Sequence, residues 1–291
     1  MRRASMPDLP ADGELAVFGL FDNSDWHPCL RAVDLVVSQL HNHDMGLVQD
    51  IIQAEIVFPC RFANMEERDY GLLYHTAEIP DSHDGNHARI LHPRDTAAAI
   101  ADVQDFYRRK GLEPRVYHLS QQGGGDGLRL ALLGADFQVA DQANQFYVHH
   151  RASRITPSTE LIIRRVQSPL PELLAMIEHS DGRRAMNVVH RSLACSSFHL
   201  LVGFLNGEPV TMGAVERVGP VARVDSVLTH KAHRGKGYAR SLIHELVRYH
   251  SRVLGGTLCL YTDNPTAARI YEEAGFEKLD VPLECWSAWE A

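Results

Sequence analysis

Residues 221–262 limit the fold more than any other stretch, because they are predicted to form a strand, a helix and a second strand in succession. The run 221–229 is mostly apolar, residues 238–254 carry apolar side chains at helical spacing, and 257–262 is apolar again. Two strands joined by such a helix run parallel and make a right-handed crossover. The chain is therefore predicted to be an α/β protein with mixed sheets and flanking helices.

The segments around this unit favour the same class of fold. Asn206-Gly207 separates two strand-like runs, and this dipeptide is the strongest short hairpin signal in the chain. Residues 264–276 predict a short helix that begins near Pro265, and 277–289 predict terminal strand structure. The C-terminal half thus has the predicted order β-α-α-β-β-β-α-β-α-β.

The N-terminal half repeats this pattern. Residues 100–120 align without a gap on residues 243–263, so that Ile100 meets Ile243, 143 positions later. Identical residues are few, but the apolar positions and the order of the elements agree. The agreement indicates two copies of one α/β unit.

The two copies differ in the lengths of two loops. At 121–127 the first copy is four residues longer, and at an earlier loop it is shorter. The first has "HPRDTAAAI" (92–100) where the second has "HKAHRGKGYARSLI" (230–243), so the first is five residues shorter. We predict a structural N-terminal domain at 1–152 and a second domain at 158–291 that carries the loop. The polar stretch between them contains a proline.

The chain is acidic, with 29 Lys and Arg against 37 Asp and Glu and a formal net charge of -8. Proteins that bind nucleic acid or anionic membranes are normally net basic, so we expect neither partner. No apolar run approaches the ~20 residues that span a bilayer, and the first residues lack the apolar stretch of a secretory signal. The five scattered cysteines fit reduced thiols. These features predict a soluble cytoplasmic protein.

The loop of the second copy is rich in glycine and cations. A helix N-terminus presents about four backbone N–H groups without partners and roughly half a positive charge. Gly235 and Gly237 let an anion approach the backbone, and Arg234 and Lys236 add mobile positive charge. This combination predicts a pyrophosphate site, although neither the P-loop nor the GxGxxG motif is present.

Two motifs together resemble a known family. "RGKGYA" (234–239) is similar to the R/Q-x-x-G-x-G/A loop of the GNAT N-acetyltransferase superfamily, which grips the pyrophosphate of acetyl-CoA. "NPTAARIYEEAGF" (264–276) begins 30 positions after Arg234 and matches the family's N-x-x-A-x-x-x-Y-x-x-x-G-F pattern. The N-terminal half resembles a degenerate GNAT copy, which would be structural and would wall the acceptor site of the second domain. The whole chain therefore resembles tandem-GNAT proteins, which have two mixed-sheet domains.

The resemblance implies a role for each element. In the family the strand before the loop diverges from the strand at 257–262, so backbone groups of Val227, Leu228 and Thr229 would bond the pantetheine arm of acetyl-CoA. Asn264 would contact the pantetheine, and Tyr271 would give a proton to the departing CoA thiolate, whose pKa near 8.5 lies below the ~10 of a phenol. The pyrophosphate would be held by the backbone N–H groups of Arg234, Gly235, Lys236, Gly237, Tyr238 and Ala239.

Direct transfer needs a neutral amine that attacks the thioester carbonyl while backbone N–H groups polarise its oxygen. Because an ammonium must first lose a proton, a carboxylate acting through water is expected. Asp225 and Glu216 are the candidates on neighbouring strands, and period-2 alternation places Asp225 on the face of Val227. Both also fit strand carboxylates without any catalytic role.

The 17 histidines raise the alternative of a metal site, through "HNHD" (41–44) and "HDGNH" (83–87). Neither has an obvious set of companion ligands, so we expect no metal. The second motif immediately precedes a predicted strand of the N-terminal half. Its polar groups can instead line a pocket for the amine.

We therefore predict an acetyl-CoA-dependent N-acetyltransferase that acts on the primary amine of a small molecule. One alternative is a non-catalytic acyl-CoA sensor or scaffold, and the other is an enzyme that acetylates a protein or peptide amine. The presence of both Asn264 and Tyr271 argues against the sensor. An acidic, two-lobed chain with an enclosed cleft favours the small molecule.

Overall fold

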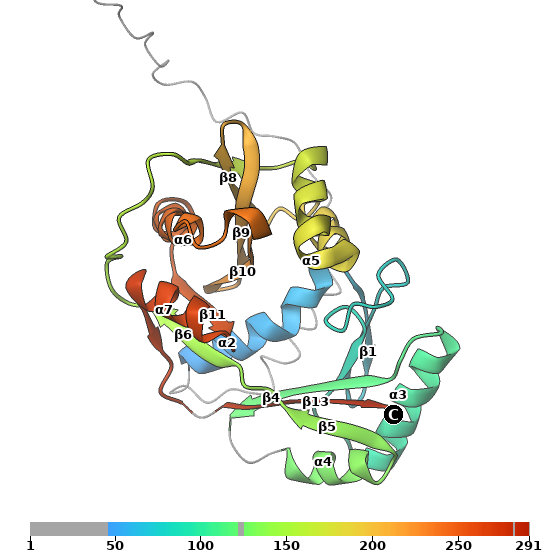
Figure 1. The fold of residues 1–291 in the computed structure, drawn as a ribbon. Helices are drawn as coiled ribbons and strands as arrows, with labels where there is room; N and C mark the ends of the chain where they lie inside the picture. Colours follow the sequence, from blue (N-terminus) through green and yellow to red (C-terminus); the bar gives the residue numbers. More distant parts are fainter. Residues whose placement is uncertain (1–45, 122–124, 282, 291) are drawn as a thin grey trace, which may run out of the picture.

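The computed structural model describes residues 46–121, 125–281 and 283–290, which form two mixed β-sheets in two lobes (Figure 1). In hydrogen-bonding order, the first sheet consists of β1 (Asn64–Arg68), β2 (Gly71–His75), β3 (His87–Ile90), β4 (Arg115–Gln121), β13 (Leu283–Glu290) and β5 (Phe137–Asp141). The second consists of β12 (Phe276–Lys278), β6 (Gln145–His149), β11 (Thr257–Thr262), β10 (Val221–Thr229), β9 (Glu208–Val218), β8 (Phe198–Leu205) and β7 (Ile162–Val166).

Helices cover both sheets. They are α2 (Gly46–Val57), α3 (Thr96–Arg109), α4 (Asp126–Leu133), α5 (Pro171–Ser192), α6 (Tyr238–Tyr249) and α7 (Pro265–Glu273), with short turns at η2 (Phe58–Arg61), η3 (Lys231–His233) and η4 (His250–Leu254). Within the described residues, none of these helices is both long and apolar enough to cross a bilayer.

The predicted crossover and hairpin are confirmed. Strands β10 and β11 pair in parallel and are joined through α6. Strands β8 and β9 pair antiparallel around Asn206 and Gly207, whose φ angles of 51° and 90° give the left-handed turn that this dipeptide favours. Both features depend on residues that are close together in the sequence, which is why the sequence predicts them well.

The two sheets have the same strand order apart from β7. In the first sheet β13 lies between β4 and β5, and in the second β6 lies between β11 and β12. Each inserted strand runs antiparallel to both neighbours. Each also comes from the other half of the sequence, so the halves exchange one strand and neither sheet follows the division expected near residues 152–158. That the first sheet is a degenerate copy of the second stays a prediction.

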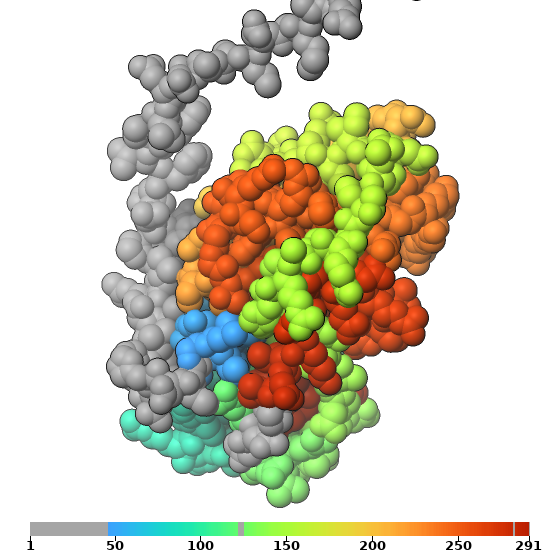
Figure 2. Space-filling view, turned by 90° about the vertical axis from the view of Figure 1, so that its left-hand side faces the viewer, coloured from blue at the N-terminus to red at the C-terminus, as the bar shows by residue number. Residues whose placement is uncertain are grey.

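Helix α2 is shared by the two sheets. Its Ile52 packs in a core with β2, whereas Ile51, which is fully buried, packs with β6, β10 and β11. Figure 2 shows this helix in blue where the orange C-terminal part meets the teal and green N-terminal part. A helix that is apolar on opposite sides belongs in the interior. It therefore carries Glu55 and the following turn η2 directly between the lobes.

The second sheet is covered on both faces. Helices α6 and α7 pack on one face, around Leu242, Leu246 and Tyr271. Helix α5 packs on the other face, together with apolar residues of β7, β8 and β9. The cavity described below lies on the α5 side, where α5, η2 and the first lobe meet.

Candidate functional site

Strands β10 and β11 separate part-way along their length. Their parallel pairing covers Val221 to Arg223 on β10 and Thr257 to Cys259 on β11, and no later pair is formed. Among the described residues, β10 pairs beyond these positions only with β9, and β11 pairs only with β6. The two facing edges, from Asp225 to Thr229 and from Leu260 to Thr262, are left without strand partners in the described chain. An extended ligand with amide groups can bond to such edges as an added strand does.

A β-bulge accompanies this separation. The register of β10 against β9 shifts between Asp225 and Leu228, and Ser226 has a φ of 54°. The bulge also overturns one expectation, because Asp225 and Val227 do not share a face. Val227 packs with the α6 side, within 3.3 Å of the position that a Cβ on Gly213 would occupy, whereas Asp225 points toward η2 on the opposite side.

The loop after β10 leads into α6 with its N–H groups free. Gly235 and Gly237 have φ values of 75° and 80°, and Gly237 is the N-cap of α6. The first backbone bond of the helix runs from Ser241 N to Gly237 O. None of the backbone N–H groups from 235 to 240 has a hydrogen-bond partner among the described residues. A Cβ on either glycine would meet nothing within 4 Å, so the surrounding space is open.

Two side chains of this loop bond to other parts of the protein, and the cationic side chains extend into solvent. Tyr238 is buried, and its hydroxyl donates to Glu160 at 3.1 Å, which leaves only its backbone N–H for a ligand. The Nε of Arg234 donates to the carbonyl of Thr229 at 3.2 Å. Arg234 and Lys236 are otherwise exposed. An anion at the N-terminus of α6 would meet unpaired donors, the helix dipole and two cations.

The second motif places Asn264 and Tyr271 on α7. The Oδ1 of Asn264 accepts from the N–H groups of Thr266 at 2.9 Å and Ala267 at 3.3 Å, so Asn264 is the N-cap of the helix. Tyr271 is 8% exposed, and its hydroxyl bonds to no described residue. Burial, with a smaller contribution from the charge of Asp225, raises the pKa of Tyr271 to about 12. The phenol therefore keeps its proton at neutral pH.

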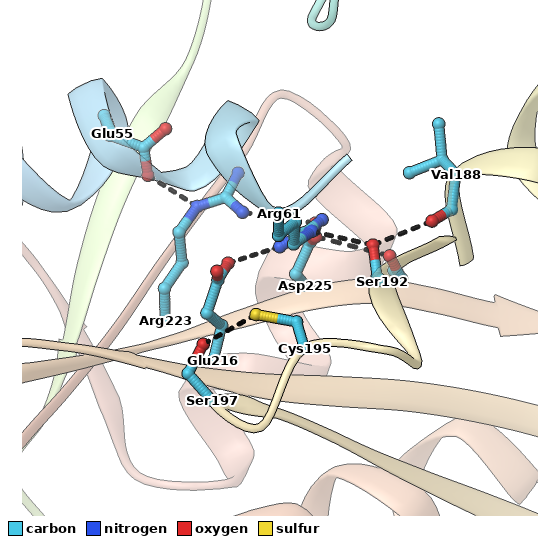
Figure 3. A network of polar contacts seen from close by, with 10 residues as sticks. Glu55, Arg61, Val188, Ser192, Cys195, Ser197, Glu216, Arg223 and Asp225 are labelled. Atoms are coloured by element: carbon cyan, nitrogen blue, oxygen red, sulfur yellow. Dashed lines mark hydrogen bonds and ion pairs between the residues drawn. The ribbon is translucent and has the colours of Figure 1, made fainter. Parts of the chain in front are cut away.

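The two predicted carboxylates meet at one guanidinium (Figure 3). Arg61 at the end of η2 pairs through Nη1 with Glu216 and through Nη2 with Asp225. The side chain of Arg61 is only 2% exposed, and its Nε donates to Ser192 Oγ at 3.0 Å. The guanidinium also lies over the ring of Phe198, 5.0 Å from the centroid.

A second arginine extends the network toward α2. The Nε of Arg223 donates to Glu55 at 2.6 Å, and its Nη1 lies 3.4 Å from Asp225 Oδ1. Together, Glu55, Arg223, Asp225, Arg61 and Glu216 form a continuous chain of alternating charges, which we call the inter-lobe ion network. It joins α2 and η2 to the strands β9 and β10 at the bulge.

The network sets the basicity of its carboxylates. Burial alone would raise the pKa of Asp225. The guanidiniums of Arg61 and Arg223 outweigh this effect and hold the pKa of Asp225 well below its usual range. Burial raises the pKa of Glu216, although Arg61 opposes the rise. Glu216 is also only 3% exposed, beneath Arg61. A carboxylate with a lowered pKa is a weak base, so this arrangement favours structural pairing over proton transfer for Asp225.

A cavity of about 280 Å³ lies between the lobes. The separated strand supplies Asp225, Ser226, Val227 and Leu228 to its wall, and the first lobe supplies His83, Asp84 and Tyr117. His83 and Asp84 of the polar motif at 83–87 thus line a cavity next to the open strand edge, and its use as an amine pocket stays a prediction. The motif at 41–44 lies outside the described residues. In the part of the chain that is described, no three metal-ligating side chains are grouped.

Two residues of the site carry no sequence motif. Arg61 follows an apolar run and belongs to the half without the glycine loop, and Arg223 lies in an otherwise apolar strand. A charged pair at Arg223 and Asp225 on a buried strand is itself a signal, because buried charges need partners. That signal indicates a partner from another element without indicating which one.

The family model for the acetyltransferase (GNAT) domain matches residues 196–278, which include the glycine loop and both separated strands. This segment is a GNAT acetyltransferase domain. The predicted acyltransferase is thereby supported at the segment that carries both motifs.

Solved structures extend the likeness to the fold of the whole chain. A GCN5-related N-acetyltransferase from Kribbella flavida has a TM-score of 0.65 at 14% identity, over 84% of this chain and 96% of that one. A tandem GNAT protein from the clavulanic acid biosynthesis pathway has a TM-score of 0.57 at 14% identity, over 91% and 95%. A GNAT-family acetyltransferase from Colwellia psychrerythraea has 0.52 at 11% identity, over 94% and 98%. The fold is thus that of GNAT acetyltransferases, one of them a tandem protein.

Proposed function

We propose that the protein transfers an acetyl group from acetyl-CoA to the primary amine of a small molecule. The observation that carries this proposal is one continuous path. It runs from the unpaired N–H groups at the start of α6, along the open edges of β10 and β11, to the cavity between the lobes. Each part of the path suits one part of acetyl-CoA and its acceptor.

Each part of the co-substrate has a counterpart among these residues. The N–H groups from Arg234 to Ala239 would hold the pyrophosphate, and the free edge at Val227, Leu228 and Thr229 would bond the pantetheine. Asn264 caps α7 with its side-chain oxygen, so its amide N–H groups are available to the same arm. Acetyl-CoA supplies a thioester, whose carbonyl is activated toward attack by an amine.

Tyr271 is the proposed acid. Its raised pKa keeps the hydroxyl protonated, and the hydroxyl has no acceptor among the described residues that would compete for the proton. Donation to sulfur lowers the barrier as charge develops on the leaving thiolate. The cavity volume of about 280 Å³ supports a small acceptor over a folded protein segment.

Steady-state release of CoA over a panel of small amines tests the function. We expect amine-dependent release by the wild-type protein, and an equal amount of acetylated amine by mass spectrometry. Tight binding of acetyl-CoA without turnover on any amine would instead support a sensor. Turnover with peptide amines alone would instead indicate an enzyme that acetylates a protein or peptide amine.

Replacing Tyr271 with phenylalanine should lower kcat by about 10²-fold, the usual contribution of one positioned acid. Binding of acetyl-CoA should change little, because the ring remains. Tyr147→Phe is the matched control, since Tyr147 is buried in the same core cluster, on β6. It should keep kcat within about twofold. Equal kcat in wild type and Tyr271→Phe would exclude Tyr271 as the acid.

A further inference from the structure

Asp84 differs from the acidic groups of the inter-lobe ion network in having no side-chain partner among the described residues. Glu55, Glu216 and Asp225 are tied to Arg61 and Arg223 in the inter-lobe ion network. The carboxylate of Asp84 forms no hydrogen bond or ion pair with any described residue, and it is exposed to the cavity that Asp225 and Leu228 also line. It is a carboxylate open to a ligand.

The loop that carries Asp84 is rigidly held. Asn86 is 4% exposed, accepts from Thr76 N at 2.8 Å, and donates to Ile79 O at 2.9 Å and Ser82 O at 3.0 Å. Next to Asp84, the N–H of Gly85 donates to Ser82 Oγ at 3.1 Å. A Cβ on Gly85 would lie 2.7 Å from a methyl group of Thr76, so the turn needs glycine there. The carboxylate is therefore preorganised although it is exposed.

The surroundings of Asp84 suit a cationic amine. Tyr117 and Tyr261 line the same cavity, and their hydroxyls bond to no described residue, so both hydroxyls can accept from an ammonium. Desolvation by the surrounding protein raises the pKa of Asp84, although the charge of Arg223 opposes the rise, so Asp84 is a stronger base than an ordinary aspartate. The charges that act on it are Arg223 and Asp225 of β10, Arg184 of α5 and Arg61 of η2. His83 and Asp181 also line this cavity.

We propose that Asp84, from the N-terminal lobe, binds the ammonium group of the acceptor and takes the proton that must leave before attack. This inference rests on the proposed function and names its acceptor class, a small primary amine that is cationic at neutral pH. The N-terminal lobe thereby supplies a catalytic residue as well as a wall. Asp225 and Glu216 act as positioning residues that hold the bulge of β10.

The proton balance is simple. The ammonium gives one proton to Asp84, and the neutral nitrogen then attacks the thioester carbon. As the amide C–N bond forms and the C–S bond breaks, Tyr271 gives its proton to sulfur and regains one from the nitrogen through solvent. Asp84 releases its proton to water. One ammonium and one thioester thus give one amide, one thiol and one free proton.

The test compares Asp84→Asn with wild type at saturating acetyl-CoA, using an alkylamine that the wild type acetylates. At neutral pH kcat/KM should fall by about 10²-fold. In the wild type log kcat/KM should reach a plateau above the pKa of Asp84. In the variant it should climb with unit slope toward the pKa of the free amine, because only neutral amine reacts. An aromatic amine, already neutral at pH 7, should react at similar rates with both proteins.

Asp81→Asn is the matched control. It makes the same change three positions earlier in the same loop, at an exposed residue that does not line the cavity. Its kcat/KM should stay within about twofold of wild type. If the wild type turns over and Asp84→Asn matches it for both amines, this inference fails while the proposed function stands. If the wild type releases no CoA with any amine, the proposed function fails, and this inference with it.

Discussion

Replacing Arg61 with alanine is expected to lower the free energy of unfolding by about 3–5 kcal/mol. The guanidinium is buried and pairs with Glu216 and Asp225 at once, so its removal leaves two carboxylates without their main counter-charge. Removal of one partner of a buried ion pair lowers stability strongly, because it leaves an uncompensated buried charge. Replacement of both partners by apolar residues often changes stability little. It should also loosen the attachment of η2 to β9 and β10.

Urea denaturation of three variants separates charge from volume. Arg61→Met keeps most of the volume beside the Phe198 ring, yet it should be nearly as unstable as Arg61→Ala. Arg109→Ala removes an exposed pair with Asp105 and should cost less than about 1 kcal/mol. Full rescue by methionine would show that the role of Arg61 is packing alone.

The pH dependence of this loss has a definite sign. Burial already raises the pKa of Glu216 in the folded protein, and removal of Arg61 takes away the largest opposing influence. A folded-state pKa above the unfolded one means that the folded state binds more protons, so stability falls as pH rises through that range. The deficit of Arg61→Met relative to wild type should therefore be smaller at pH 5 than at pH 7. An equal deficit at both pH values would contradict this.

Replacing Gly237 with glutamate should weaken acetyl-CoA binding more than 100-fold, or by about 3 kcal/mol. The new carboxylate would stand at the N-cap of α6, among the unpaired N–H groups proposed to hold the pyrophosphate. A Cβ there meets nothing within 4 Å, so the fold should survive apart from the strain of a φ of 80°. Isothermal titration calorimetry measures the loss.

Gly207→Glu is the control for strain. Gly207 has a φ of 90° and equally open surroundings, but it lies in the turn between β8 and β9. The affinity of the Gly207→Glu protein for acetyl-CoA should equal that of the wild-type protein. Unchanged affinity in Gly237→Glu, or an equal loss in Gly207→Glu, would contradict the assignment of the loop.

The parts of the site that the sequence predicted are those fixed by local chemistry. Left-handed φ angles at Gly235 and Gly237, a helix N-terminus after them, and capping by Asn264 all follow from a few adjacent residues. The hairpin at Asn206-Gly207 belongs to the same class. Two such signals in the right order were enough to indicate the family.

What the sequence could not predict depends on contacts between distant elements. The exchange of β6 and β13 requires pairing of strands from opposite halves, and repeat matching assigns each strand to its own half. The bulge at Ser226 reverses the faces that alternation assigns to Val227. The pairing of Arg61 with Asp225 spans 164 positions. Periodicity contains no information on such partners.

A crystal structure of the protein soaked with acetyl-CoA tests the central claim most directly. We expect one molecule per chain, with its pyrophosphate at the N-terminus of α6, its pantetheine between β10 and β11, and its acetyl group facing the cavity that Asp84 lines. Density for acetyl-CoA at the N-terminus of α3 on the first sheet, with none between β10 and β11, would contradict the account.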